Sequence, residues 1–311
     1  MTLTQLEYLV ALDNYRHFAQ AAEKCFVTQP TLSMQIQKLE EELGVKIFDR
    51  TKQPVIPTEI GTGIIAQARI AIREAGMIRQ LISERQDTLS GELRIGIIPT
   101  LAPYLLPPLY KTMRVKYPQV SLVIKESVTE EVVHELKRNR LDCSIVVTPL
   151  NDPSIKEEVL FYEELFVYVS KKNALSGKKY VLPGDIDPGQ LWLLEEGHCF
   201  RAQALNLCEL KKSSDFHFKY ETGNIETLKR MVDKSDGITI LPELAVMEFR
   251  KSQLDLVKRL KQPSPAREVS LVTHRHHLKN RLVRTLKEEI LNIVPVSMRQ
   301  LNNKKVVEIN Y

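Results

Sequence analysis

The chain has 311 residues, of which 43% are hydrophobic and 27% are charged, and its formal net charge is +5. This composition is typical of a soluble globular protein of two or three domains, and four cysteines exclude a disulfide framework. No cysteines are spaced C-x-x-C, so we expect no metal centre and no cofactor. Residues 1–7 lack a signal-peptide pattern and four prolines interrupt the most apolar stretch, residues 95–110. We therefore expect a cytoplasmic protein, off the membrane, with reduced thiols.

The first 43 residues predict three helices. Apolar residues recur at helical spacing from Leu3 to Leu12, and residues 18–25 favour a second, shorter helix. Thr28 is an expected N-cap for the third, with Pro30 in its first turn. Small alanines in the second helix allow a close crossing. This is helix-turn-helix geometry, in which the third helix enters the major groove of DNA.

Residues 44–58 predict a short β-hairpin, a wing that carries Lys46, Arg50 and Lys52 toward a phosphate backbone. Charge alone does not indicate nucleic-acid binding, because residues 1–60 contain six basic and eight acidic side chains. On periodicity alone, the alternative is any small helical domain with an alternating surface.

The runs 18–22, 27–33 and 36–50 resemble the winged helix-turn-helix of LysR-type transcriptional regulators. The match has no gaps from about residue 3 to residue 65, although the wing is more basic than in many members. The resemblance implies that residues 1–58 bind promoter DNA. The residues expected at the DNA are Gln29, Pro30, Thr31, Ser33, Met34, Gln35, Lys38, Arg50, Lys52 and Pro54.

Residues 59–86 predict one long linker helix with an apolar residue every three or four positions. This stripe consists of Ile60, Ile64, Ala68, Ile72, Ala75, Ile78 and Ile82. Such a stripe needs a partner, which is either its own domain or a second subunit. The family resemblance implies a homodimer formed through this helix, and a homotetramer as the working assembly.

Residues 87–295 begin with a polar hinge and then alternate between strand and helix patterns. Alternation of this kind predicts an α/β body with parallel sheets. The resemblance implies a two-lobed fold like that of periplasmic binding proteins. The expected strands are residues 93–98, 120–125, 143–147, 165–169 and 237–242, and the expected helices are residues 105–117 and 130–139.

Two threonines follow the first two strands of this body. Thr100 and Thr129 are either helix N-caps or hydroxyls at the rim of a cleft between the lobes. Residues 296–311 are expected to be a polar, solvated C-terminal tail with no assigned role.

Cys199 and Cys208 bracket a predicted helix that runs from residue 200 to residue 212. Nine residues of helix separate them by about 13.5 Å and place them on opposite faces, so a disulfide requires the helix to unravel. His198, Arg201 and the helix start favour a thiolate at Cys199, which we expect to attack. Cys208 lies among leucines and is the expected resolving thiol. The alternative is a small buried apolar residue, the role we expect for Cys25 and Cys143.

Four segments resemble the peroxide-sensing members of the LysR-type family: residues 95–100, 197–208, 226–232 and 237–242. The resemblance implies a peroxide pocket lined by Thr100, Thr129, His198, Arg201 and Arg267. It also implies control of oxidative-stress genes together with RNA polymerase, with the balance of activation and repression left open, and resetting by a thiol reductant of the glutaredoxin or thioredoxin type. Residues 209–225 depart from the pattern and leave the geometry of switching open.

Two other functions fit part of the pattern. A LysR-type regulator of the ordinary kind would bind a small molecule, with the cysteines incidental. A thiol peroxidase would share the cysteine chemistry but would not explain the helix-turn-helix. We expect a regulator and not an enzyme.

Overall fold

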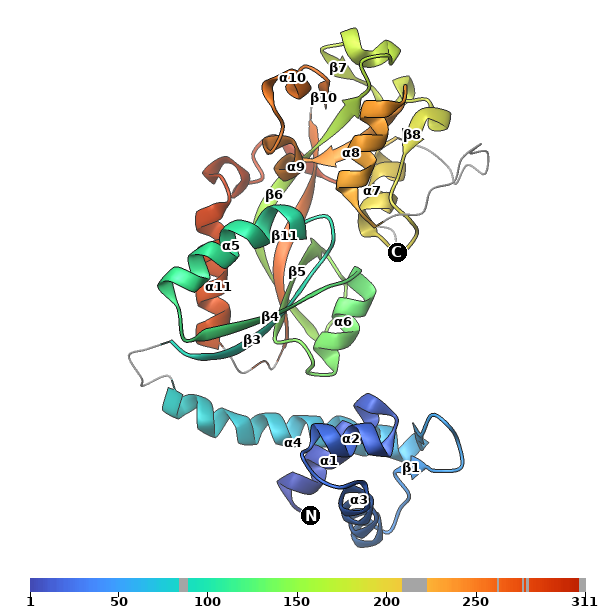
Figure 1. The fold of residues 1–311 in the computed structure, drawn as a ribbon, viewed down its shortest axis with the longest axis vertical. Coiled ribbons are helices and arrows are strands. Elements are labelled where there is room, and N and C mark those ends of the chain that lie inside the picture. The colour runs from blue at the N-terminus through green and yellow to red at the C-terminus, as the bar shows by residue number, and fades with distance from the viewer. Residues whose placement is uncertain (84–88, 209–222, 262, 276, 278–279, 308–311) are drawn as a thin grey trace. The chain divides into compact units, whose positions relative to one another are not determined.

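The structure is a computed structural model that describes residues 1–83, 89–208, 223–261, 263–275, 277 and 280–307 (Figure 1). The chain divides into two units, residues 1–87 and most of residues 88–311. Each unit has its own apolar core. No helix among the described residues is long and apolar enough to cross a membrane.

The first unit is a winged helix-turn-helix followed by a long helix. Its elements are α1 (Leu3–Tyr15), α2 (Phe18–Lys24), α3 (Gln29–Leu43), β1 (Phe48–Asp49), β2 (Ile56–Pro57) and α4 (Glu59–Ser83). Thr28 is the N-cap of α3 and accepts a hydrogen bond from the Thr31 amide, and Pro30 lies in the first turn, as predicted. The two wing strands pair antiparallel.

The linker helix α4 packs its N-terminal half on its own domain. Ile65 and Ala68 are buried in the core of the first unit, and Arg69 binds Asp13 of α1 at 2.7 Å. Farther along, Ile70 and Ile78 are exposed. The apolar stripe therefore divides between a face that α1 covers and a face that the chain itself leaves open.

The second unit has two lobes built on strands that run through both. Its first lobe contains β3 (Gly91–Ile97), α5 (Ala102–Lys116), β4 (Val120–Glu126), α6 (Thr129–Lys137), β5 (Cys143–Thr148) and α11 (Asn280–Ile293). The second contains β7 (Tyr180–Val181), β8 (Leu191–Trp192), α7 (Cys199–Leu207), α8 (Ile225–Lys234), β9 (Ile238–Pro242), α9 (Glu243–Met247), α10 (Lys251–Leu254) and β10 (Val257–Leu260).

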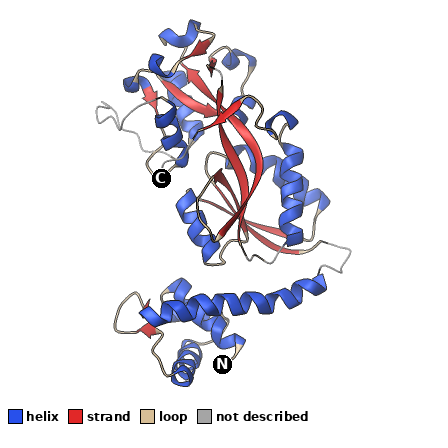
Figure 2. Cartoon of the chain, turned by 180° about the vertical axis from the view of Figure 1, so that it is seen from behind, coloured by secondary structure: helices blue, strands red, loops and turns tan. Residues whose placement is uncertain are grey.

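The strands β6 (Ile155–Val169) and β11 (Ser264–His274) join the lobes. They pair antiparallel along most of their length and pass through both lobes (Figures 1 and 2). In the first lobe β4, β3 and β5 are parallel, as the alternating pattern predicted, and β11 adds antiparallel to β5. In the second lobe β9 and β10 pair antiparallel with β6.

The start of α5 and the C-terminal tail differ from the sequence prediction. Helix α5 begins at Ala102 and not at residue 105, because Pro103 falls in the first turn, where its missing amide hydrogen costs nothing. The tail expected to be solvated is partly ordered: β12 (Lys304–Val306) pairs parallel with β11. β5 pairs with β11 only from Glu268 onward, so that edge is open at Ser264–Ala266 and accepts the tail.

The second lobe also holds the only tryptophan of the sequence. Trp192 in β8 donates from Nε1 to Ser235 Oγ at 3.3 Å, and its carbonyl accepts from the Thr239 hydroxyl at 2.8 Å. A Cβ atom at Gly237 would lie 2.3 Å from the indole nitrogen, so only glycine fits beside the ring.

Candidate functional site

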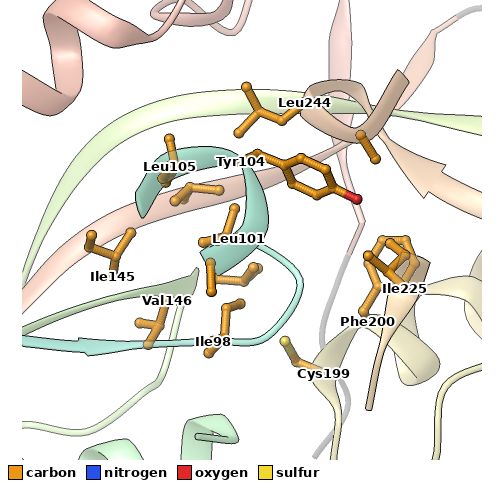
Figure 3. Packing of buried hydrophobic residues seen from close by; sticks show 14 of the residues in the cluster. Ile98, Leu101, Tyr104, Leu105, Ile145, Val146, Cys199, Phe200, Ile225 and Leu244 are labelled. Carbon is orange, nitrogen blue, oxygen red and sulfur yellow. The ribbon is translucent and has the colours of Figure 1, made fainter. Parts of the chain in front are cut away.

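Cys199 is the first residue of α7 and lies where the two lobes meet. It lines a narrow crevice with segments from both, namely Ile98, Pro99, Thr100, Val128, Thr129, His198 and Phe200. Figure 3 shows the thiol at the edge of the apolar cluster, between Ile98 and Phe200. The side chain is buried, at 7% exposure. A reactive group here is shielded from bulk water.

Cys208 lies at the opposite end of the same helix, as its C-cap, and is also buried. Nine residues of α-helix separate the two cysteines by about 13.5 Å along the axis. All four cysteines have free thiols. The predicted helix is confirmed from Cys199 to Leu207, and its expected continuation through residues 209–212 lies outside the described residues. The structure therefore holds the two thiols apart.

Burial and local charge act in opposite directions on the Cys199 thiol. Burial is the larger effect and raises its pKa, because a thiolate loses its hydration in this site. The Arg267 guanidinium, the Thr129 hydroxyl and the Phe200 amide at the helix start all lower that pKa. The site thus disfavours the anion overall but places three groups that stabilise it.

Arg267 is completely buried and is held from two sides. Its Nη1 donates to Thr100 Oγ1 at 2.7 Å, and its Nε donates to Glu163 Oε2 at 2.7 Å. Its guanidinium carbon lies 5.1 Å from the centre of the Phe200 ring. Thr100 and Arg267, which are 167 positions apart in sequence, therefore meet beside Cys199, because β11 carries Arg267 across the junction of the lobes.

His198 and Arg201 are placed differently from each other. His198 is the N-cap of α7 and lines the crevice, with Nε2 3.5 Å from Glu195 Oε1. Arg201 is not part of the crevice lining and donates from Nη1 to the Leu194 carbonyl at 2.8 Å. The contribution of His198 and Arg201 to the Cys199 pKa stays a prediction, and the cation that lowers this pKa in the structure lies on β11. The cation is Arg267.

Neither threonine of the crevice is a helix N-cap. The N-caps of α5 and α6 are Leu101 and Val128. Thr100 instead accepts from Arg267, and Thr129 is the first residue of α6. Thr129 Oγ1 lies near the Cys199 sulfur but makes no full hydrogen bond with any described residue. A buried hydroxyl without a partner is costly, and a small polar molecule in the crevice would satisfy it.

The predicted DNA-contacting residues gather on α3 and the wing. Gln29, Pro30, Met34, Lys38, Lys52 and Pro54 are exposed. Ser33 and Arg50 contact each other, with Arg50 Nη1 donating to Ser33 Oγ at 3.3 Å. Thr31 and Gln35 are partly buried, since their side chains bind Thr28 and Gln5.

A buried carboxylate that the sequence analysis did not single out organises this surface. Glu40 of α3 is 2% exposed and accepts from the amides of Ile47 and Phe48 and from Arg50 Nη2. It thereby ties the wing to the third helix. The only sequence signal is its place in the run 40–42, where three consecutive glutamates look like a solvated helix face.

Comparison with known proteins agrees with this architecture. Residues 3–62 match the bacterial regulatory helix-turn-helix of the LysR family, and residues 86–293 match the LysR substrate binding domain. A winged helix-turn-helix joined by a long helix to a two-lobed sensor defines a class of bacterial transcription regulators. The chain belongs to the LysR family and is a transcription regulator.

Individual relatives point to one branch of that family. The chain is 37% identical to the DNA-binding transcriptional dual regulator OxyR of Escherichia coli, covering 88% of this chain and 89% of the relative. It is 34% identical to the regulator EstR of Acinetobacter baylyi, covering 88% and 91%. A full-length OxyR variant from Pseudomonas aeruginosa has a similar structure, with a TM-score of 0.79, 33% identity and coverage of 93% and 94%.

Proposed function

We propose that this regulator senses hydrogen peroxide through reversible formation of a Cys199–Cys208 disulfide. The observation that carries the proposal is the crevice at Cys199. A buried thiol at a helix start faces the Thr129 hydroxyl, which makes no full hydrogen bond with any described residue, and a second free thiol lies at the far end of the same helix. Relatives named as hydrogen peroxide-inducible genes activators support this assignment.

The chemistry follows from these groups. The Cys199 thiolate attacks one peroxide oxygen, the O–O bond breaks, and the other oxygen leaves as hydroxide, which takes up a proton to become water. The sulfur becomes a sulfenic acid. Cys208 then attacks that sulfur, water leaves, and the disulfide forms. Two thiols reduce one peroxide to two waters, and an external dithiol reductant of the glutaredoxin or thioredoxin type restores both.

The helix converts this chemistry into a signal. Two cysteines about 13.5 Å apart along α7 cannot bond until their Cα atoms come within about 7 Å. Disulfide formation therefore unwinds α7 and repacks its lobe. The protein forms a homodimer through α4, and two such dimers form a homotetramer. In this assembly the repacking alters the spacing of the DNA-binding domains. The changed spacing alters the response of RNA polymerase at oxidative-stress promoters.

The same proposal assigns the DNA contacts. The exposed face of α3, with Gln29, Met34 and Lys38, reads base edges in the major groove of promoter DNA. The wing, with Lys52 and Pro54, lies along the phosphate backbone. Such a regulator works in the cytoplasm, where thiol reductants keep Cys199 and Cys208 in the reduced form.

The test is a footprint on promoter DNA with the full-length protein before and after peroxide treatment. Cys199→Ser should bind DNA as the reduced protein does and should show no change after peroxide. Cys143→Ser is the matched control, because Cys143 is buried in β5 away from the crevice, and it should respond normally. An unimpaired response of Cys199→Ser would contradict the proposal.

The second candidate is a regulator that binds a small organic molecule between the lobes, which the match of residues 86–293 to the LysR substrate binding domain favours. Mass spectrometry of peroxide-treated protein distinguishes the two functions. A 199–208 intramolecular disulfide supports peroxide sensing, and its absence supports the alternative.

A further inference from the structure

Glu163 is a carboxylate at the centre of the second unit that takes no part in the chemistry above. It lies on β6, and its side chain is completely buried. In the β6–β11 ladder its cross-strand partner is Arg267, so the two side chains stand on the same face of the sheet. A buried carboxylate is retained only where its charge is matched and its oxygens are hydrogen-bonded.

Both carboxylate oxygens of Glu163 are engaged. Oε2 accepts from Arg267 Nε at 2.7 Å and lies 2.7 Å from Nη2 of the same guanidinium. Oε1 accepts from the Leu244 amide, near the start of α9, at 2.9 Å. The backbone of the second lobe therefore fixes the carboxylate, and the carboxylate fixes the guanidinium.

The guanidinium in turn fixes Thr100. Arg267 Nη1 donates to Thr100 Oγ1 at 2.7 Å, and Nη2 donates to the Thr100 carbonyl at 3.3 Å. A hydroxyl that accepts from a guanidinium has one hydrogen left, which it donates away from that cation. Thr100 lines the crevice beside Cys199, so this hydrogen is available to a molecule bound there.

We propose that Glu163 is a positioning residue for the reaction of Cys199 with peroxide, acting through Arg267 on the Thr100 hydroxyl. As the S–O bond forms and the O–O bond breaks, the departing oxygen gathers negative charge. A hydroxyl proton held in place stabilises that charge without further reorganisation. The proposal rests on the peroxide-sensing function, and it adds a residue that never touches the peroxide.

Glu163 also sets the charge that Cys199 experiences. Arg267 lowers the pKa of the buried Cys199 thiol, and the paired carboxylate offsets part of that cationic field. Removing the carboxylate charge leaves the guanidinium uncompensated. The two roles of Glu163 therefore separate in experiment: its loss should favour the thiolate and yet slow the attack on peroxide.

The experiment uses Glu163→Gln in the full-length protein and two measurements on Cys199. Oxidation by peroxide should slow by about tenfold or more, because one positioned donor is lost. Alkylation by iodoacetamide needs no such donor, and its pH profile should move to lower pH. Unchanged oxidation would overturn the proposal. Loss of both reactions by the same factor would also overturn it, because that is the signature of a damaged fold.

Two variants complete the test. Glu163→Asp keeps the charge but is one methylene too short to hold both Arg267 and the Leu244 amide, so its alkylation profile should stay in place while oxidation slows. Glu164→Gln, the neighbouring residue on the opposite face of β6, should leave both reactions unchanged. If Cys199 of the unaltered protein fails to react with peroxide, the proposed function fails, whatever Glu163 does.

Discussion

Thr129 places a buried hydroxyl beside the Cys199 sulfur, and this hydroxyl lowers the pKa of the thiol. Thr129 is 4% exposed, and Oγ1 makes no full hydrogen bond among the described residues. Thr129→Val keeps the shape of the side chain and removes a buried hydroxyl that makes no full hydrogen bond with a described residue. The free energy of unfolding should stay equal or rise by up to about 1 kcal/mol, as measured by urea titration. The rate of Cys199 oxidation by peroxide should fall on the order of tenfold or more.

A different result would separate two roles for this hydroxyl. If Thr129→Val lost stability and kept its oxidation rate, Thr129 would serve the fold and not the peroxide. Thr148→Val is the comparison, because the Thr148 hydroxyl hydrogen-bonds Glu268 and Ser270. The free energy of unfolding of that variant should fall by about 1 kcal/mol or more, and its rate of Cys199 oxidation should stay the same.

Cys208 makes stability depend on pH. Burial raises its pKa to about 12, whereas an unfolded chain ionises a cysteine near about 8.5. The thiol form is favoured in the folded state, so its stabilisation is present below about pH 8.5 and is lost as pH rises toward 12. Urea midpoints under reducing conditions should fall from about pH 8.5 upward.

The same proton linkage sets the size of this pH effect on stability and suggests the control variant. One such thiol lowers the free energy of unfolding by at most about 1.4 kcal/mol per pH unit in that window. Cys208→Ala should flatten the slope, although the variant starts from a lower stability. A slope that does not change would place its origin elsewhere, with Cys199 as the next candidate, since burial raises that pKa as well.

The site was predictable from sequence only where its residues are neighbours. Cys199, His198 and the helix start follow directly from the chain, and the crevice brings the two threonines to them. Glu163 gave no signal, because a Glu-Glu pair between apolar runs looks like a solvated loop. Its burial depends on a cross-strand partner 104 positions away, which no local pattern encodes.

At the scale of elements, β12 and Val307, the residue after it, link β11 to α7. The Val307 amide donates to the Ala266 carbonyl of β11 at 2.8 Å, and the Val307 carbonyl accepts from Gln203 of α7 at 3.3 Å. Gln203 is completely buried. Unwinding α7 must therefore break its bond to the C-terminal segment, so this segment favours the reduced arrangement.

Truncation after Asn303 removes β12 and tests this coupling. The amides of α7 should exchange with solvent faster, and the 199–208 disulfide should form several-fold faster at a given peroxide concentration, as followed by mass spectrometry. Truncation after Val307 keeps β12 and should behave like the intact chain. Equal rates of amide exchange in α7 of the two truncated proteins would show that β12 does not stabilise α7.

Sequence patterns predicted the short strands better than the long strands. Strands β3, β4 and β5 alternate with helices and were predicted near their observed bounds. Of the 15 residues of β6, only the apolar end from Leu165 to Val169 was predicted, because charged residues fill the preceding part. These charges are tolerated because β6 is paired on both sides and β11 supplies Arg267 opposite Glu163.

At the scale of the whole molecule, the exposed side of α4 predicts self-association. Ile78 is 65% exposed on a helix that packs Ile65 and Ala68 into the core of its own domain. Ile78→Glu should shift the protein toward monomers in analytical ultracentrifugation and weaken binding to a two-site promoter by about tenfold or more. Glu74→Gln, at an exposed polar position of the same helix, should leave assembly intact. Monomers in the unaltered protein would contradict the prediction.

The single indole gives the molecule a built-in optical probe. Trp192 is seven positions before Cys199, and its nitrogen and carbonyl both bind residues of the lobe that α7 must repack. Its emission should change when oxidant is added, with no dye or label attached. The proposed switching of this regulator can therefore be timed in solution by the fluorescence of Trp192 in the native chain.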